Sequence, residues 1–313
     1  MKGLELSKKY YECCGLPMLE EQFPELLPHL AIGLCGSGSE CFGFDDGLSQ
    51  DHDFEPGFCI FLPGEDVISR RDAFLLERAY AKLPKEFEGF RRCMLAPAGG
   101  ARHGVLSAAE FFLSKTGSED GNLSPETWLS LPEYSLAEAV NGEIFRDDER
   151  FFTKIREKIA HYPRDIRLKK LAGNLLLLSQ SGSYNYDRCL KHGETAAAQM
   201  SLYEFIKAAM QTAFLLSDRY MPYYKWSFRA LSQLESFPSL PEYLEFLIST
   251  GNDDDTAENK HWVMDEVISR LLEVLQEQEL TDAICQDCQK HAESVNDRIS
   301  DPTLRNLSLL AGV

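Results

Sequence analysis

Residues 31–62 read AIGLCGSGSECFGFDDGLSQDHDFEPGFCIFL, and this stretch decides how the N-terminal half folds. Its two apolar runs, residues 31–35 and 58–62, are short and end at glycine or proline, which predicts two buried strands. The residues between the runs are rich in glycine, serine and aspartate. The polar groups that can do chemistry are therefore expected on the connection between these two strands.

Asp51 and Asp53 occupy alternate positions near the end of this connection, where we expect the second strand to be entered. Side chains at i and i+2 of a strand share one face, so both carboxylates would point at one spot. Two close carboxylates repel each other unless a cation lies between them. The pair therefore predicts a site for Mg²⁺ (or Mn²⁺), a hard cation that is usually shared with substrate phosphates.

The segment Gly36-Ser37-Gly38-Ser39 follows the first predicted strand directly. Glycines allow a phosphate to approach the backbone closely, and serine hydroxyls and free N–H groups can donate to its oxygens. These four residues are therefore the predicted phosphate contacts.

The order Gly-Ser, a short spacer and Asp-x-Asp resembles the signature of the polymerase-β-type nucleotidyltransferase superfamily. Gly38-Ser39 matches the Gly-Ser that binds nucleotide phosphates, and Gly36-Ser37 is an extra copy just before it. Asp51 and Asp53 match the aspartates that hold the metal ions. Ser49 stands for the serine that usually precedes the first aspartate, displaced here by one residue, and it joins the predicted nucleotide contacts.

A longer set of segments resembles an uncharacterised bacterial family of nucleotidyltransferase-like proteins, akin to the aminoglycoside nucleotidyltransferases. The matching segments run over most of the chain and are Gly38–Asp46, Asp51–Phe54, Leu131–Glu133, Gly142–Phe145, Tyr162-Pro163 and Tyr220–Trp226. The resemblance implies nucleotidyl transfer, with a nucleoside triphosphate as co-substrate.

The hydrophobic pattern changes along the chain. A helix is expected between residues 66 and 83, and short strands around Val105 and at 143–146. Beyond about residue 148 the pattern is helical, with helices expected at 152–159, 168–179, 195–216, 226–234, 241–248 and 263–275, and an acidic exposed loop at 251–255. The predicted fold is α+β, a small mixed-sheet nucleotidyltransferase domain (1–148, with a helical lead at about 1–28) followed by an all-α helical bundle (149–313).

A third carboxylate, which serves the superfamily as general base or metal ligand, is missing from its expected strand. Residues 101–106 contain no carboxylate, and Glu110 falls just past them in an expected helix. His103 is an alternative base. The base could instead come from elsewhere in the chain, for which the candidates are Glu143, Glu194 and Glu204.

Three basic residues of the second half are candidate phosphate contacts. Arg188 and Lys191 share one face if their segment is helical. Lys225 lies in the aromatic segment 219–226, where tyrosines could stack on a base or substrate. Lys225-Trp226 is similar to a Lys-Trp pair of the aminoglycoside enzymes, in which the lysine contacts nucleotide. The alternative for this segment is a corner of the core anchored by aromatic side chains.

The composition and net charge limit the partners and the cellular location that we expect for this protein. The chain has 313 residues, of which 44% are apolar and 26% charged, with a net charge of −18. Such an acidic protein repels phosphate backbones, which argues against long DNA or RNA as a partner. We find neither a membrane-length apolar stretch nor a signal peptide and expect a cytosolic protein. The oligomeric state stays open.

Nine scattered cysteines form no disulfide framework, and we expect most of them to be reduced. Cys285, Cys288 and His291 outline half of a zinc site without a second ligand pair. We favour the alternative, a helix with two cysteines one turn apart.

These observations predict a Mg²⁺-dependent nucleotidyltransferase that acts on a hydroxyl of a small molecule or a protein and releases pyrophosphate. The alternatives are a catalytically inactive nucleotide-binding regulator or antitoxin-like protein, and a helical interaction protein with a vestigial domain.

Overall fold

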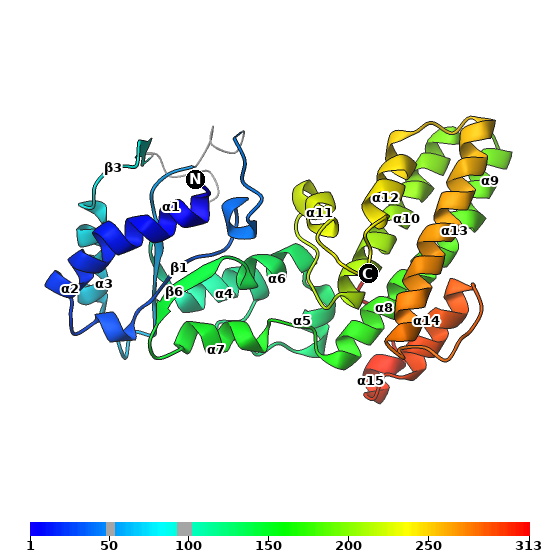
Figure 1. The fold of residues 1–313 in the computed structure, drawn as a ribbon. Helices are drawn as coiled ribbons and strands as arrows, with labels where there is room; N and C mark the ends of the chain where they lie inside the picture. The colour runs from blue at the N-terminus through cyan, green and yellow to red at the C-terminus, as the bar shows by residue number, and fades with distance from the viewer. Residues whose placement is uncertain (48–53, 93–101) are drawn as a thin grey trace. The chain divides into compact units, whose positions relative to one another are not determined.

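The structure is a computed structural model that describes residues 1–47, 54–92 and 102–313. These residues form two compact units (Figure 1). The sheet unit comprises Met1–Leu123 and Tyr134–Ala160, and the helical unit comprises Ser124–Glu133 and His161–Val313. The domain boundary predicted between residues 148 and 149 stays a prediction. In the part of the chain that the structure describes, every helix is too short or too polar to span a bilayer.

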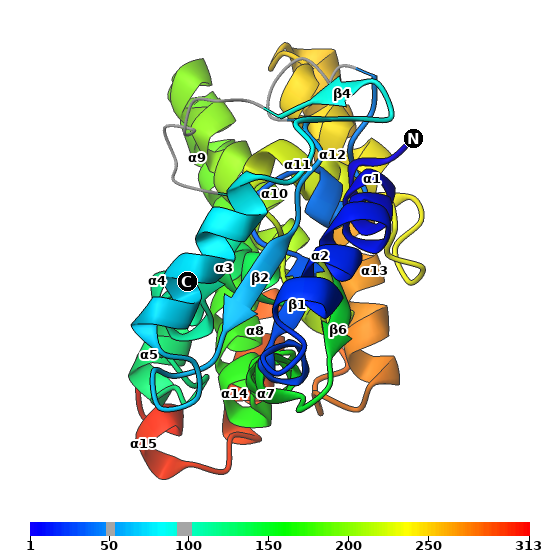
Figure 2. The same cartoon turned by 90° about the vertical axis from the view of Figure 1, so that its left-hand side faces the viewer.

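The sheet unit contains a four-stranded mixed sheet in the order β5-β2-β1-β6. Strand β1 (Ala31–Leu34) pairs antiparallel with β2 (Cys59–Leu62) and with β6 (Glu143–Asp147), as Figure 2 shows. Strand β5 (Gly104–Ser107) runs parallel to β2. All four residues of β1 are buried, as a continuous apolar run predicts. The expected α+β class with a small mixed sheet is confirmed.

Helices and apolar side chains cover the sheet. The expected helical lead consists of α1 (Gly3–Tyr10), a π-helical turn and α2 (Leu16–Gln22). With α3 (Arg70–Ala81) these residues enclose a core that includes Tyr10, Ile32, Phe58, Ile60 and Tyr80. The expected helix at 66–83 begins later, at Arg70, because Ser69 caps it by accepting a hydrogen bond from the Asp72 N–H.

A second group of aromatic side chains joins the sheet to two further helices, α4 (Ala108–Thr116) and α7 (Phe151–Lys158). Phe61 of β2 stacks on Phe152, with ring centroids 4.2 Å apart. The sheet unit also holds a small hairpin of β3 (Glu86–Phe87) and β4 (Phe90–Arg91). Helix α6 (Glu133–Val140) connects the helical unit to β6 along the chain.

The helical unit is built on α8 (Arg164–Ser179) and α10 (Thr195–Leu216). The remaining helices are α5 (Pro125–Ser130), α9 (Tyr186–Lys191), α11 (Tyr224–Leu231), α12 (Leu240–Ser249), α13 (Asp254–Glu277), α14 (Cys288–Asp297) and α15 (Pro302–Arg305). The predicted helices are present, and 195–216 coincides with α10. Helix α13 begins well before residue 263, because Asp253 caps it by accepting from the Thr256 N–H at 3.1 Å. Residues 254 and 255 of the expected acidic loop therefore belong to the first turn of α13.

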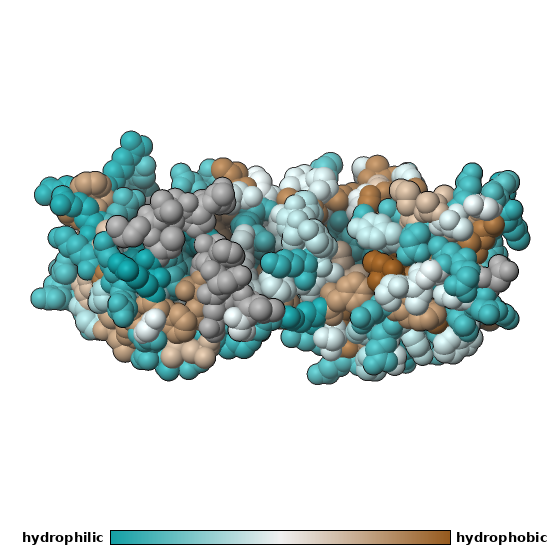
Figure 3. Space-filling view, turned by 90° about the horizontal axis from the view of Figure 1, so that it is seen from above, coloured by the Kyte–Doolittle hydropathy of each residue, from teal (hydrophilic) through white to brown (hydrophobic). Residues whose placement is uncertain are grey.

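The protein is acidic, with a net charge of −18. On the face seen in Figure 3, hydrophilic residues surround separate apolar patches. Three lysines are nevertheless buried in the helical unit, Lys169, Lys170 and Lys260, and each donates to backbone carbonyls. Buried ammonium groups are retained only where such acceptors replace water.

Candidate functional site

Three predicted site residues, Ser49, Asp51 and Asp53, lie outside the described residues. Strand β2 begins at Cys59, and Phe54–Phe58, which precede it, have no regular secondary structure. The aspartate pair precedes β2 in the sequence, and the expectation that it leads into this strand stays a prediction. Whether the two carboxylates share a face stays a prediction.

The glycine-serine loop, Gly36–Ser39, follows β1 as predicted. Gly36 has a φ of 106° and Gly38 a φ of 134°, and both angles favour glycine. The side chain of Asn141 fixes the loop: its Oδ1 accepts from the Gly36 N–H, and its Nδ2 donates to the Gly36 carbonyl, each at 2.8 Å. The Gly36 N–H is thus engaged, which corrects the expectation of a free backbone donor there.

Ser37 is the exposed tip of this loop. Its hydroxyl donates to Glu138 Oε2 at 2.8 Å and accepts from Lys115 Nζ at 3.1 Å. Lys115 and Glu138 also form an ion pair with each other. Helix α4 carries the lysine and α6 carries the glutamate, so two helices distant in sequence meet at one serine of the loop.

A second ion pair, between Arg102 and Glu40, lies against Gly38. A Cβ atom at position 38 would be 1.9 Å from Arg102 Nη2 and 2.4 Å from Glu40 Oε1, so glycine is required for space as well as for conformation. Arg102 Nε donates to the Ser37 carbonyl at 3.1 Å. Ser39 leads into a single 3-10 turn, Glu40–Phe42, and its carbonyl accepts from the Phe44 N–H at 2.8 Å.

The loop opens on a cavity of about 350 Å³ within the sheet unit. Its lining includes Gly36, Ser37, Arg102, Lys115 and Ser107, the N-cap residue of α4. Two thiols also line the cavity, and burial raises the pKa of Cys35 to about 12 and that of Cys59 well above its usual value. Both cysteines are therefore neutral at physiological pH and are poor nucleophiles.

Strand β5, the neighbour of β2, carries no carboxylate, in agreement with its sequence. A carboxylate that sequence reasoning missed lies nearby: Glu55 Oε1 is 3.4 Å from Nδ1 of His103, next to the start of β5. Glu55 lies two residues after Asp53 in the sequence, and this spacing is the signal by which it could have been found.

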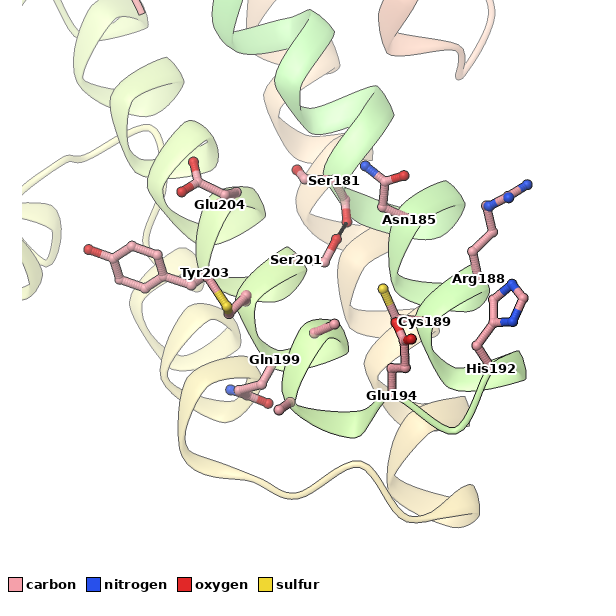
Figure 4. A pocket seen from close by; sticks show the side chains of 13 residues that line it. Ser181, Asn185, Arg188, Cys189, His192, Glu194, Gln199, Ser201, Tyr203 and Glu204 are labelled. Carbon is pink, nitrogen blue, oxygen red and sulfur yellow. Dashed lines mark hydrogen bonds between the residues drawn. The ribbon is translucent and has the colours of Figure 1, made fainter.

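The other candidate residues are distributed over both units. Glu143 of β6 pairs with Lys8 at 2.5 Å in the sheet unit. Arg188, Glu194 and Glu204 line one cavity of about 880 Å³ in the helical unit, between α9 and α10 (Figure 4). The structure thus brings together three residues that had been chosen separately.

Lys225 is exposed on α11, with its Nζ 5.0 Å from the centroid of the Trp226 ring. Arg229 approaches the same ring, with Cζ 5.5 Å from the centroid. The predicted pairing of cations with aromatic rings is present here, and the nucleotide contact stays a prediction.

Segments quoted for the family resemblance meet in a buried cluster of the helical unit. The Met221 N–H donates to Glu133 Oε2 at 3.3 Å, and the rings of Tyr162 and Tyr220 are 4.9 Å apart. Burial raises the pKa of Glu133 to about 7, against the opposing effect of Lys170. The Tyr162 hydroxyl is buried and has no hydrogen-bond partner among the described residues.

The zinc alternative is not supported. His291 Nε2 contacts the Cys285 carbonyl at 2.7 Å, and Nδ1 contacts Thr281 Oγ1 at 3.1 Å, so both ring nitrogens are occupied. Cys288 is buried at the start of α14. Within residues 1–47, 54–92 and 102–313, no three His, Cys, Asp or Glu side chains are grouped to hold a metal ion.

A comparison with protein families finds a match to a family described as Domain of unknown function (DUF4037), over residues 128–227. Glu133, Tyr162 and Tyr220 all fall within the matched residues, whereas the glycine-serine loop precedes them. No curated protein matches the chain.

Proposed function

We propose that this protein is a nucleotidyltransferase, which moves a nucleoside monophosphate from a nucleoside triphosphate to a hydroxyl of a small molecule or a protein. The observation that carries the proposal is the glycine-serine loop after the central strand β1, which opens on a cavity bordered by Arg102 and Lys115. A glycine-rich turn with nearby cations suits a polyphosphate. The net charge of −18 favours an acceptor other than long nucleic acid, and we propose a cytosolic location.

In the proposed reaction, the acceptor oxygen attacks the α-phosphorus and forms a new P–O bond. The bond from the α-phosphorus to its bridging oxygen breaks, pyrophosphate leaves with the bonding electrons, and the hydroxyl proton passes to a base. Loop hydroxyls and the two cations would hold the phosphates in line, because positioning and charge stabilisation dominate phosphoryl chemistry. Glu143, Glu194 and Glu204 remain the proposed bases.

The fit of a magnesium ion depends on Asp51 and Asp53. Of the described carboxylates beside the loop, Glu40 and Glu138 are each paired with a cation, and Glu110 lines the same cavity; none of the three belongs to a group that could hold a metal. A bound ion would neutralise charge on the leaving pyrophosphate.

A specific observation favours the alternative of a non-catalytic nucleotide-binding regulator or antitoxin-like protein. Strand β5 has no carboxylate, and both cations at the loop already have carboxylate partners. Such a protein would bind a triphosphate without cleaving it.

The experiment is incubation with each nucleoside triphosphate, labelled at the α-phosphate, together with Mg²⁺ or Mn²⁺ and candidate acceptors. Transfer is read by mass spectrometry, pyrophosphate release by a coupled assay, and binding by the melting temperature. Asp53→Asn is expected to lose transfer by about 100-fold or more. The matched control is Asp255→Asn, which removes one exposed carboxylate from α13.

Equal transfer by wild type and Asp53→Asn would contradict the role of that aspartate. A rise in melting temperature without pyrophosphate release would favour the non-catalytic alternative.

A further inference from the structure

The ammonium group of Lys115 has two partners at the glycine-serine loop. It donates to Ser37 Oγ at 3.1 Å and pairs with Glu138, while Ser37 Oγ also donates to Glu138 at 2.8 Å. The Lys115 and Glu138 side chains are only 20% and 16% exposed. The three groups form a closed triangle, in which a partly desolvated carboxylate accepts from both a serine and a lysine.

The Arg102–Glu40 pair repeats this arrangement on the neighbouring residues. Arg102 donates through Nε to the Ser37 carbonyl at 3.1 Å and pairs through Nη2 with Glu40. The side chains of this pair are 23% and 14% exposed. Each cation therefore contacts the loop with one donor and a carboxylate with another.

We propose that Lys115 and Ser37 bind a phosphate group of a polyphosphate ligand, and that Glu138 is the exchangeable counter-ion that this phosphate displaces. The proposal rests on the proposed function, because it takes the loop as the site of the triphosphate. Carboxylate and phosphate oxygens are both anionic acceptors for a lysine ammonium and a serine hydroxyl. Both anions cannot remain on one ammonium at low exposure without strong mutual repulsion.

The loop should keep its shape when Glu138 is changed, because Asn141 fixes its backbone independently through two hydrogen bonds to Gly36. Glutamine at position 138 retains an oxygen that can accept from Ser37 and Lys115. The substitution Glu138→Gln thus removes the competing charge with little change in volume.

The experiment measures the affinity for inorganic tripolyphosphate by calorimetry at one low ionic strength, since salt screens these charges. Glu138→Gln is expected to bind about tenfold more tightly than wild type, because a neutral amide competes weakly for Lys115. Lys115→Met is expected to bind about tenfold more weakly than wild type, and the double variant should show no gain over Lys115→Met. Glu157→Gln is the matched control. It removes a carboxylate that is 57% exposed and pairs with Arg150 in the same unit. Circular dichroism verifies folding, and if Glu138→Gln does not fold, Lys115→Met alone decides, since unchanged tripolyphosphate affinity in that variant would overturn the proposal.

Equal or weaker binding by Glu138→Gln would overturn the proposal, as would a gain that persists without Lys115 or no binding by any variant. The labelled-transfer assay then separates the two proposals. Transfer without tripolyphosphate binding would leave nucleotidyl transfer standing and remove this subsite. Tighter tripolyphosphate binding by Glu138→Gln without any transfer would support the subsite and contradict nucleotidyl transfer.

Discussion

The substitution Glu133→Gln should stabilise the helical unit at neutral and alkaline pH. Burial raises the pKa of Glu133 from 4.5 to about 7, while Lys170, the Met221 N–H and Lys207 act in the opposite direction. The native state therefore holds a proton more tightly than the unfolded state. Protonated Glu133 contributes stability that is fully present below pH 4.5 and is lost as the pH rises through 7.

The magnitude follows from the size of the shift. Each unit of pKa difference corresponds to 1.36 kcal/mol, so ionisation of Glu133 costs about 3 kcal/mol of unfolding free energy. Glutamine never ionises and can still accept from the Met221 N–H. The variant should match wild type within about 1 kcal/mol near pH 4.5 and exceed it by about 3 kcal/mol at pH 8.

The assay is urea unfolding followed by tryptophan fluorescence at a series of pH values. The three tryptophans, Trp128, Trp226 and Trp262, all belong to the helical unit, so their emission reports on the unit that holds Glu133. Glu245→Gln, which changes an exposed carboxylate of α12, is the matched control and should show no pH-dependent gain. A stability difference that is constant with pH, or a less stable Glu133→Gln at pH 8, would show that Lys170 outweighs burial and would refute the reasoning.

Two further substitutions test the packing, and each has a matched control. Gly38→Ala should lower the melting temperature more than Gly43→Ala. Gly43 has a φ of 70° in the left-handed region, which costs alanine about 1 kcal/mol, whereas the φ of 134° at Gly38 costs alanine at least as much. Only position 38 adds a clash with Arg102, since nothing lies within 4 Å of a Cβ at position 43. Equal losses would contradict the close approach. Tyr162→Phe should raise the unfolding free energy by about 1 kcal/mol, because it removes a buried hydroxyl that has no hydrogen-bond partner in the described part of the chain. Tyr186→Phe should lower it by a similar amount, because it removes a 2.9 Å hydrogen bond to Asn252 Oδ1. Urea unfolding measures both, and a destabilised Tyr162→Phe would show that its hydroxyl has a partner.

The secondary structure could largely be predicted from the sequence. The run at 31–35 contains β1, and the apolar-rich segment 195–216 is α10. Helix starts were less accurate, since Ser69 and Asp253 were not recognised as caps and the predicted bounds of α3 and α13 moved accordingly. Caps depend on one side chain and one N–H, which a hydrophobic pattern does not reveal.

The candidate site was predictable only in part. The glycine-serine loop follows β1 as its sequence predicts, but Lys115, Glu138 and Asn141 were not foreseen as its partners. These residues lie 78, 101 and 105 positions from their loop partners, and one sequence by itself contains no signal for such pairings. The burial of Glu133 was equally hidden, because an acidic residue that begins a helix is ordinarily exposed.

The sequence by itself determined the four strands of the mixed sheet, most of the helices and the turn at Gly36 and Gly38, because each depends on residues close together along the chain, whereas the hairpin of β3 and β4 was not predicted. Only the tertiary structure decided that Ser37 meets a paired lysine and glutamate, and that Glu133 is buried against Met221. The physical reason is packing, which brings side chains distant in sequence together and excludes water from them. That loss of water sets the strength of each charge interaction and the pKa of Glu133.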